Sequence, residues 1–249
     1  MITIKSKTEI EKMRIAGRLT GEVLNMLEEH IKPGITTGQL DKLAYDYITS
    51  HGAKPSFLHY EGYPASLCTS INDEVVHSIP SKKNVLREGD IISIDVGAYI
   101  GGYHGDAART FPVGAVSEEA RHLIDVTRES FFRGIEHAKH GAKLGDISAA
   151  IQEYVESNGF SVVRDLVGHG IGKNMHEDPS VPNYGHAGRG VKLAAGMTLA
   201  IEPMVNMGTY KVYVQDDDWT VVSADGSLSA HYENTVLITH DECEILTLV

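Results

Sequence analysis

The sequence predicts an α+β fold in which two similar halves share one sheet and one hydrophobic core. Three features indicate this fold: two pairs of helix signals, strand-like segments rich in β-branched residues, and a repeat at an offset of 107 positions. With 249 residues and 42% apolar side chains, the chain can bury a sizeable core without disulfides. We therefore expect one domain over residues 1–249, with repeat halves of about 1–107 and 108–249.

The first fifty residues carry the signals of two helices. Ser6 with Glu9, and Thr36 with Gln39, have the spacing of capping boxes and stand ahead of helically spaced apolar residues. The glycines that separate and end these predicted helices are Gly34 and Gly52.

Residues 117–159 repeat that plan. Ser117 is the candidate cap of a helix that we expect to reach about Ala138, Gly141 marks the break, and a second helix is expected to close at Gly159.

A gap-free shift of 107 positions superposes two separate blocks of the chain. The second block includes Asp95 on Glu202, and a single coincidence of this kind carries little weight. Two blocks at one offset favour a duplicated helix-helix-strand unit, in which each half delivers a carboxylate from the end of an equivalent strand. The superposed pairs are His30 on His137, Lys32 on Lys139, Gly34 on Gly141, Gly38 on Gly145, Tyr47 on Tyr154, Ser50 on Ser157, Gly52 on Gly159, Gly89 on Gly196 and Ile94 on Ile201.

A β-hairpin is predicted around the glycine pair at residues 101–102, because both central positions of the turn can take positive φ there. This turn pairs Asp95 with Ala108 and places Asp106 two residues along on the same face of the sheet. Two acids side by side repel each other unless they share a cation. For these two aspartates alone, an exposed hairpin with ordinary surface acids is the simpler interpretation.

Further candidate ligands follow in three later segments. His169 and His176 lie among glycines, which let the backbone approach an ion or substrate closely, although a lone histidine there can equally be a structural hydrogen-bonder. Glu202 and Glu233 are each expected to follow an apolar strand, where a charge is costly unless it is paired or bound to a metal. Neither glutamate has a lysine or arginine in its own segment.

Together, four carboxylates and one imidazole form a set too large for one zinc ion and suited to two divalent ions. Four carboxylates balance the charge of two such ions. Oxygen ligands with one nitrogen favour Mn²⁺, Fe²⁺, Co²⁺ or Zn²⁺, and the ligand set does not choose among them.

Five ordered segments resemble those of the methionine aminopeptidases, and the match is collinear over almost the whole chain. The segments are SINDEVVHSIP, IDVGAYIGGYHGDAARTF, VGHGIGKNMHEDP, GMTLAIEPM and WTVVSADGSLSAHYENTV. The resemblance implies the pita-bread fold, with two pseudo-symmetric αβ halves around a central antiparallel sheet that carries a two-metal centre. It implies removal of the N-terminal initiator methionine from nascent proteins, with preference for a small second residue.

The resemblance also implies a role for each matching residue. Asp106 and Glu233 would bridge the two ions, Asp95 would complete one, and His169 with Glu202 the other. Glu202 would in addition carry the proton from the attacking water to the leaving amine. The residues implied to contact the substrate are the non-ligand histidines His77 and His176 and, around the methionine side chain, Tyr60, Tyr63, Cys68, Met175, Trp219 and the rim residue Phe57.

Three positions depart from the family pattern. Met175 replaces an aromatic residue in the pocket wall, and Asn234 stands where a histidine is common after the bridging glutamate. Glu74 lies in a loop that some relatives use, with Asn72 and Ser229, to hold a monovalent cation. None of the three is a predicted metal ligand.

The short spacing between His176 and Glu202 leaves no room for the helical insertion of type II enzymes, so the chain resembles type I. The chain begins directly at the catalytic unit, which suggests the bacterial type without an N-terminal extension.

An Xaa-Pro peptidase shares the five-ligand pattern but usually carries an additional N-terminal domain. A binding module on this fold is a second alternative, and such modules characteristically lose metal ligands.

Composition limits the partners and the location. The net charge of -12 argues against binding nucleic acid or anionic lipid. No apolar run approaches the ~20 residues of a membrane span, and the two cysteines, Cys68 and Cys243, are expected to be free thiols. We expect a cytoplasmic monomer that acts on nascent polypeptides and associates transiently with the ribosome.

Overall fold

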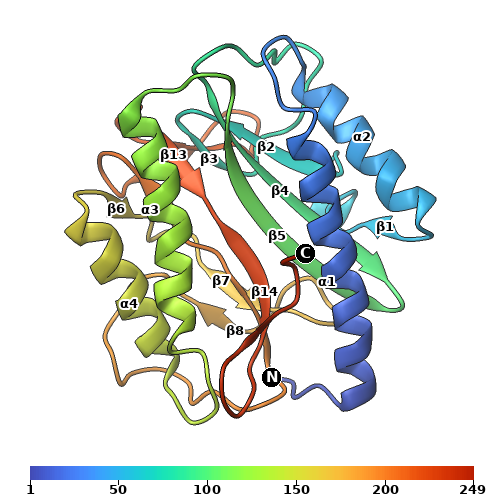
Figure 1. Ribbon diagram of the computed structural model, residues 1–249, viewed down its shortest axis with the longest axis vertical. Coiled ribbons are helices and arrows are strands. Elements are labelled where there is room, and N and C mark those ends of the chain that lie inside the picture. The colour runs from blue at the N-terminus through green and yellow to red at the C-terminus, as the bar shows by residue number, and fades with distance from the viewer.

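The computed structural model describes residues Met1–Val249 and places two helix pairs over one face of a central sheet (Figure 1). Helices α1 (Lys7–Glu28) and α2 (Thr37–Ser50) lie on the right of this view, and α3 (Glu118–Ile135) and α4 (Leu144–Ser157) on the left. Ser6 and Thr36 form the predicted capping boxes, and the Ser117 side chain accepts from the Ala120 N–H. These three predicted helix starts are confirmed.

The end of α3 was predicted three residues too late. The helix stops at Ile135 rather than near Ala138, because the chain turns back there and Lys139 pairs with Thr239. The glycine break at Gly141 follows this turn, with φ of 92°.

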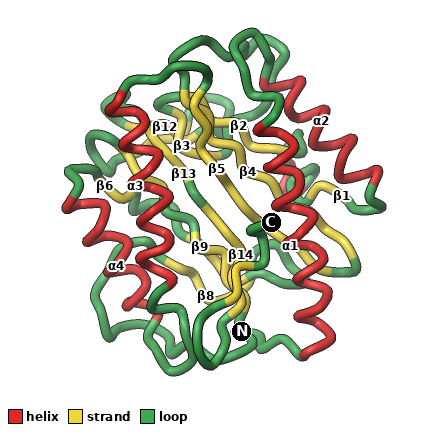
Figure 2. Tube along the Cα trace, viewed as in Figure 1, coloured by secondary structure: helices red, strands yellow, loops and turns green.

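The central sheet has nine strands, and every ladder in it is antiparallel. Helices and strands are segregated along the chain and in space, as the predicted α+β class requires (Figure 2). Its main path runs β1, β4, β5, β14, β9, β7, β8, while β2 pairs with β4 and β15 with β14. The strands are β1 (Lys54–Pro55), β2 (Leu67–Ile71), β4 (Ile91–Ile100), β5 (Tyr103–Pro112), β7 (Gly168–Gly170), β8 (Glu177–Val181), β9 (Thr198–Ile201), β14 (Glu233–Leu237) and β15 (Glu244–Ile245).

Two small three-stranded sheets and one 3-10 turn complete the fold. One small sheet is formed by β13 (Ser229–His231), β10 (Met204–Asn206) and β6 (Ser161–Val162). The other is formed by β11 (Val212–Val214), β12 (Val221–Ser223) and β3 (Glu74–Val76), and the 3-10 turn spans Tyr60–Gly62.

The hairpin of β4 and β5 has the predicted register, with Asp95 opposite Ala108 and Gly97 opposite Asp106. Ile92, Ile94 and Val96 are fully buried in the core under α1 and α2, so Asp95 points to the opposite face. The expectation that both halves deliver a carboxylate from a strand end is right for Glu202, which follows β9, and wrong for Asp95. Strand β4 continues five residues past Asp95, because it stays paired with β5 up to the glycine turn.

The 107-residue offset reappears in the positions of the elements. Helix α4 begins and ends 107 positions after α2 (37 to 144, 50 to 157), and α3 ends 107 positions after α1 (28 to 135). Each helix pair covers its own part of the core, one under β4 and β5 and the other under β9 and β14. The two halves therefore contribute strands to one sheet, and the helices of both halves cover the same face of that sheet (Figure 1).

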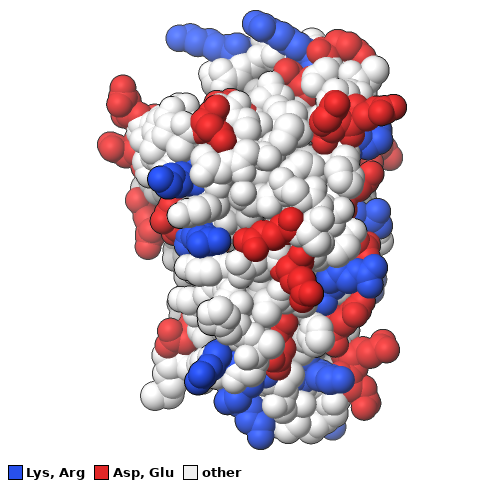
Figure 3. All heavy atoms as spheres, turned by 90° about the vertical axis from the view of Figure 1, so that its left-hand side faces the viewer, with Lys and Arg blue, Asp and Glu red and all other residues white.

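Both cysteines are free thiols, as predicted. No helix combines the length and the apolar character needed to cross a membrane. Acidic and basic side chains are interspersed on the face shown in Figure 3.

Candidate metal centre

Five consecutive strands of the central sheet each supply one of the predicted ligands. In sheet order, β4 carries Asp95, β5 carries Asp106, β14 carries Glu233, β9 leads directly into Glu202, and β7 carries His169. The positions lie far apart in the sequence, and only the pairing of these strands brings them to one place. The structure thus brings together all five residues of the predicted ligand set.

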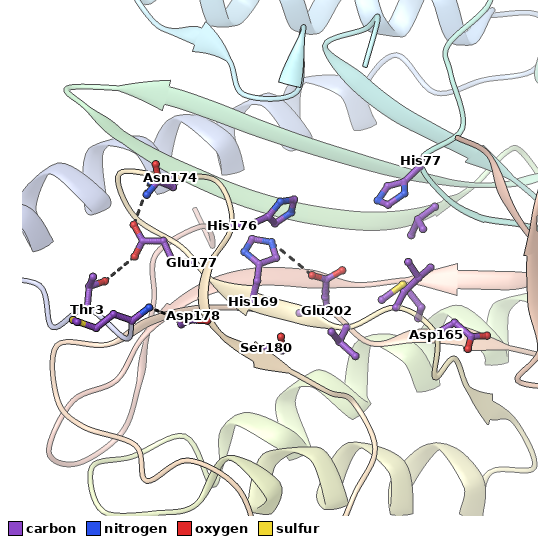
Figure 4. Close-up of a pocket in the computed structure, with 16 residues that line it drawn as sticks. Thr3, His77, Asp165, His169, Asn174, His176, Glu177, Asp178, Ser180 and Glu202 are labelled. Atoms are coloured by element: carbon purple, nitrogen blue, oxygen red, sulfur yellow. Dashed lines mark hydrogen bonds and ion pairs between the residues drawn. The ribbon is translucent and has the colours of Figure 1, made fainter. Parts of the chain in front are cut away.

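The polar atoms of these side chains point toward one another. His169 Nε2 lies 3.6 Å from Asp106 Oδ2. It lies 3.8 Å from Glu202 Oε1, the contact drawn in Figure 4. One ligand atom each from Asp106, His169 and Glu233 lies within 4.8 Å of the others. His169 Nδ1 is 2.8 Å from the Gly170 carbonyl oxygen, to which it donates, so the Nε2 lone pair remains free for an ion.

Burial makes this group of acids hard to ionise without a cation. It raises the pKa of Asp95 to about 7, and burial together with neighbouring carboxylates raises the pKa values of Asp106, Glu202 and Glu233 well above the usual range. Burial lowers the pKa of His169 to about 3, which keeps the imidazole neutral as a ligand.

The ligand set fits divalent metal ions. Asp95 Oδ1, Asp106 Oδ1 and Glu233 Oε1 are buried without a hydrogen-bond partner in the protein. Buried carboxylate oxygens of this kind are normally paired or bound to a metal. Four hard oxygen donors and one imidazole nitrogen are ligands of divalent first-row metals.

The sequence analysis did not identify a half-buried arginine behind the site, Arg109. Arg109 donates to the main-chain carbonyl of Glu233 and, at 2.6 Å, to Asn234 Oδ1. Asn234 also accepts from the Thr247 hydroxyl at 2.9 Å. In this chain, Asn234 therefore anchors Arg109 against the strand that carries Glu233.

A small cavity of ≈ 120 Å³ adjoins the ligands. The rings of Tyr63 and Trp219 meet edge to face at 5.0 Å, and Met175 and Cys68 are 2% and 5% exposed. Apart from the ligands, the cavity is lined by Phe57, Tyr60, Glu61, Tyr63, Cys68, His77, Met175, His176 and Trp219. All the residues that we expected to contact the substrate lie here, together with Glu61, which the sequence analysis did not include.

His77 and His176, the two histidines predicted to contact the substrate, lie at the mouth of this cavity. His176 Nδ1 is 2.9 Å from the Tyr60 hydroxyl, and the His176 ring packs against His169 with centroids 4.3 Å apart. When the tyrosine hydroxyl donates, His176 Nε2 carries the ring hydrogen and can donate to a substrate. A wider cleft of ≈ 720 Å³ continues past His77, His176 and Glu202 (Figure 4).

A buried ion pair holds the loop that carries His176. Lys5 Nζ lies 2.7 Å from Glu177 Oε2, and the two side chains are only 5% and 8% exposed. The Thr3 hydroxyl donates to the same oxygen at 2.7 Å. The sequence analysis missed this contact because 172 residues separate the two partners.

We expect Lys5→Met to lower the free energy of unfolding by about 3–5 kcal/mol, because it leaves Glu177 buried without its cation. Lys42→Met is the matched control, since the Lys42–Asp46 pair has the same 2.7 Å distance but is 71% and 54% exposed, and its removal should cost less than ~1 kcal/mol. Urea unfolding of both variants measures the difference, and equal losses would contradict the role of the buried pair.

Comparison with known protein families also indicates a peptidase that uses metal. A model of metallopeptidase family M24 matches residues 11–240. The chain belongs to metallopeptidase family M24. It is thus a metal-dependent hydrolase of peptides. Family membership and the candidate ligand cluster confirm the predicted use of divalent metal.

Within family M24, the chain is similar to the methionine aminopeptidases over its whole length. It is 65% identical to the methionine aminopeptidase of Clostridium acetobutylicum, covering 100% of this chain and 99% of that protein. It is 50% identical to methionine aminopeptidase 1 of Bacillus subtilis over the full length of both. The predicted membership of the methionine aminopeptidases is confirmed.

Solved structures of M24 peptidases show the same fold. The methionine aminopeptidase of Thermotoga maritima superposes with a TM-score of 0.99 at 49% identity, covering 100% of both chains. A prolidase from Pyrococcus horikoshii superposes with a TM-score of 0.79 at 23% identity, and this chain covers 63% of it. The latter likeness shows the fold alone, and together the two confirm the predicted pita-bread architecture.

Proposed function

We propose that this M24 peptidase removes the N-terminal methionine from new polypeptides through the five residues gathered on the sheet. The observation that carries the proposal is the position of the apolar cavity beside these residues. A slot walled by Tyr63, Met175 and Trp219 beside the metal ligands would admit one apolar side chain and bring the following peptide bond next to the centre.

Two divalent ions fit the charge and the geometry of the site. Asp106 and Glu233 come from the neighbouring strands β5 and β14 and would be shared by the ions, Asp95 would complete one, and His169 with Glu202 the other. Mn²⁺, Fe²⁺, Co²⁺ and Zn²⁺ all match the donor set. Divalent ions supply Lewis-acid chemistry at such a site, because they polarise a carbonyl and lower the pKa of water toward ~7. A monovalent cation beside Asn72, Glu74 and Ser229 stays a prediction.

The side chains divide the remaining work. Glu202 lies partly open to the cleft, with 14% of its side chain exposed, and would take a proton from water and pass it to the leaving amine. His176 would donate to the oxygen of the scissile carbonyl, where negative charge develops. His77 lies across the same pocket and bounds the space for the second residue.

The cavity walls explain the choice of side chain. Trp219, Tyr63 and Met175 form an apolar slot that suits an unbranched thioether, and a charged first residue would be buried there without a partner. The wall at His77 leaves room only for a small second residue such as alanine, glycine or serine.

We also propose that residues 1–249 act as one cytoplasmic, monomeric catalytic domain whose halves are about 1–107 and 108–249. One sheet joined by strands of both halves supports the single domain. The substrate of a peptidase is a polypeptide, and transient association with the ribosome would deliver nascent chains to the cleft. The net charge of -12 speaks against direct binding to nucleic acid.

A peptide panel tests the proposal. With metal-loaded enzyme, Met-Ala-Ser should be a good substrate, Met-Lys-Ser a poor one and Ala-Pro nearly inert. Each missing methylene in an apolar pocket is worth roughly 1–3 kcal/mol, so Ala-Ala-Ser should be cut at least 10-fold more slowly than Met-Ala-Ser. The measurement is kcat/KM for each peptide.

The same panel separates the alternatives. Comparable rates for Leu-Ala-Ser and Met-Ala-Ser would contradict the role of the cavity in specificity. A preference for Ala-Pro would favour an Xaa-Pro peptidase. Failure to cut any peptide with any of the four metals would favour a binding module.

A further inference from the structure

A sixth polar side chain, that of His231, lies inside the metal centre without a role in the account above. His231 ends strand β13 and is 1% exposed. Its Nε2 atom lies 3.8 Å from Glu202 Oε2 and 4.0 Å from Glu233 Oε2. Neither ring nitrogen has a hydrogen-bond partner.

The backbone of His231 is held firmly, so this position of the ring is built into the fold. Its N–H donates to the Thr110 hydroxyl at 2.8 Å, and its carbonyl accepts from the same hydroxyl at 2.9 Å. His231 also pairs with Met204 in the ladder between β10 and β13.

The ring of His231 can donate a hydrogen bond. An imidazole carries a hydrogen on at least one of its nitrogens, and neither nitrogen of His231 has a partner in the protein. A buried N–H needs an acceptor, and ionised carboxylate oxygens are strong acceptors. Of the two carboxylates near Nε2, that of Glu202 is the closer.

Glu202 lies between two histidines that differ in what they can do. His169 Nδ1 donates to Gly170, so His169 Nε2 faces Glu202 Oε1 with a lone pair and cannot donate to it. His231 Nε2 faces the other oxygen, Oε2. The main-chain carbonyl of Glu202 accepts from Asn183, which holds the backbone but leaves the carboxylate free to turn. Between these two histidines, only His231 can fix the direction of the carboxylate.

We propose that His231 is a positioning residue that donates from Nε2 to Glu202 Oε2 and thereby directs Glu202 Oε1 toward His169 and the bound ion. The proposal rests on the function proposed above for Glu202. The move needed is small, because closing the gap from 3.8 Å to hydrogen-bond distance takes about one ångström at a side chain that faces the cavity.

Two substitutions of His231 distinguish the effect of hydrogen-bond donation from the effect of side-chain volume. His231→Gln keeps an N–H donor at similar reach, whereas His231→Leu fills similar space without one. Tyr232→Phe is the control for disturbing the strand, since Tyr232 packs against Arg109 and Phe131. Each protein is loaded with Co²⁺, and the measurements are Co²⁺ affinity by calorimetry, the visible Co²⁺ spectrum, kcat and KM for Met-Ala-Ser, and thermal unfolding.

We expect His231→Leu to fold, to lose roughly 10- to 100-fold in kcat or in affinity for one Co²⁺, and to show a shifted spectrum, because partners that orient a ligand typically contribute this much. His231→Gln and Tyr232→Phe should remain close to the unchanged enzyme, and KM should change little in any variant.

Equal behaviour of His231→Leu and the unchanged enzyme would overturn the proposal. Equal loss of Co²⁺ in both His231 variants would also overturn it, since His231 would then be a ligand itself. If the unchanged enzyme cut no peptide, the proposed function would fail, while the Co²⁺ spectra would still test the position of Glu202.

Discussion

Asp106→Ala is expected to abolish peptide cleavage and to lower the metal content of the enzyme. Asp106 lies on β5, between the strands that carry Asp95 and Glu233, and its Oδ2 atom is 3.6 Å from His169 Nε2. A carboxylate that contacts both ions leaves both under-coordinated when it is lost. The measurements are kcat/KM for Met-Ala-Ser and metal content by elemental analysis after dialysis.

Two further variants make this result specific. Asp106→Asn keeps the shape but not the charge, and it should lose activity in the same way. Asp125→Ala removes an exposed aspartate of α3 and should change neither activity nor metal content. Full turnover by Asp106→Ala in metal-replete buffer would contradict a bridging role.

His176→Ala is expected to lower kcat by roughly 10²- to 10³-fold while the enzyme keeps its metal, the usual effect of removing a donor to a developing oxyanion. His176 lies beside His169 in the pocket, but its Nδ1 is engaged by Tyr60. Steady-state kinetics with elemental analysis measure both quantities.

The exposed His186 supplies the control, because His186→Ala removes an imidazole away from the pocket and should leave kcat unchanged. Metal loss in His176→Ala would show that His176, rather than His169 alone, binds an ion.

Local signals in the sequence predicted the helices and the hairpin well. The capping boxes at Ser6 and Thr36 involve residues only three positions apart, so sequence alone can identify them. The Gly101–Gly102 turn determines the register of a two-residue hairpin, which is why Asp95 pairs with Ala108 as predicted.

The order of the strands could not be predicted in the same way. Pairing of β14 with β5 and β9, and of β9 with β7, joins segments that are far apart in the chain, and no local pattern specifies such partners. The ligand set was therefore assembled from residue chemistry and from a family resemblance. The structure then showed that five neighbouring strands bring these residues together.

Contacts that support the site were missed for a related reason. Arg109 reaches the carbonyl of Glu233 across 124 positions, and Lys5 reaches Glu177 across 172. In the sequence, both cations are indistinguishable from ordinary surface charges. His231 was overlooked because a single histidine in a strand is more often structural than functional.

The central claim, a two-ion centre built by five residues, is tested most directly by a crystal structure of the Mn²⁺-soaked enzyme with an anomalous difference map. We predict two peaks, one touching Asp95, Asp106 and Glu233, and the other touching Asp106, His169, Glu202 and Glu233. A single peak at full occupancy with excess Mn²⁺, or peaks away from these side chains, would contradict the account.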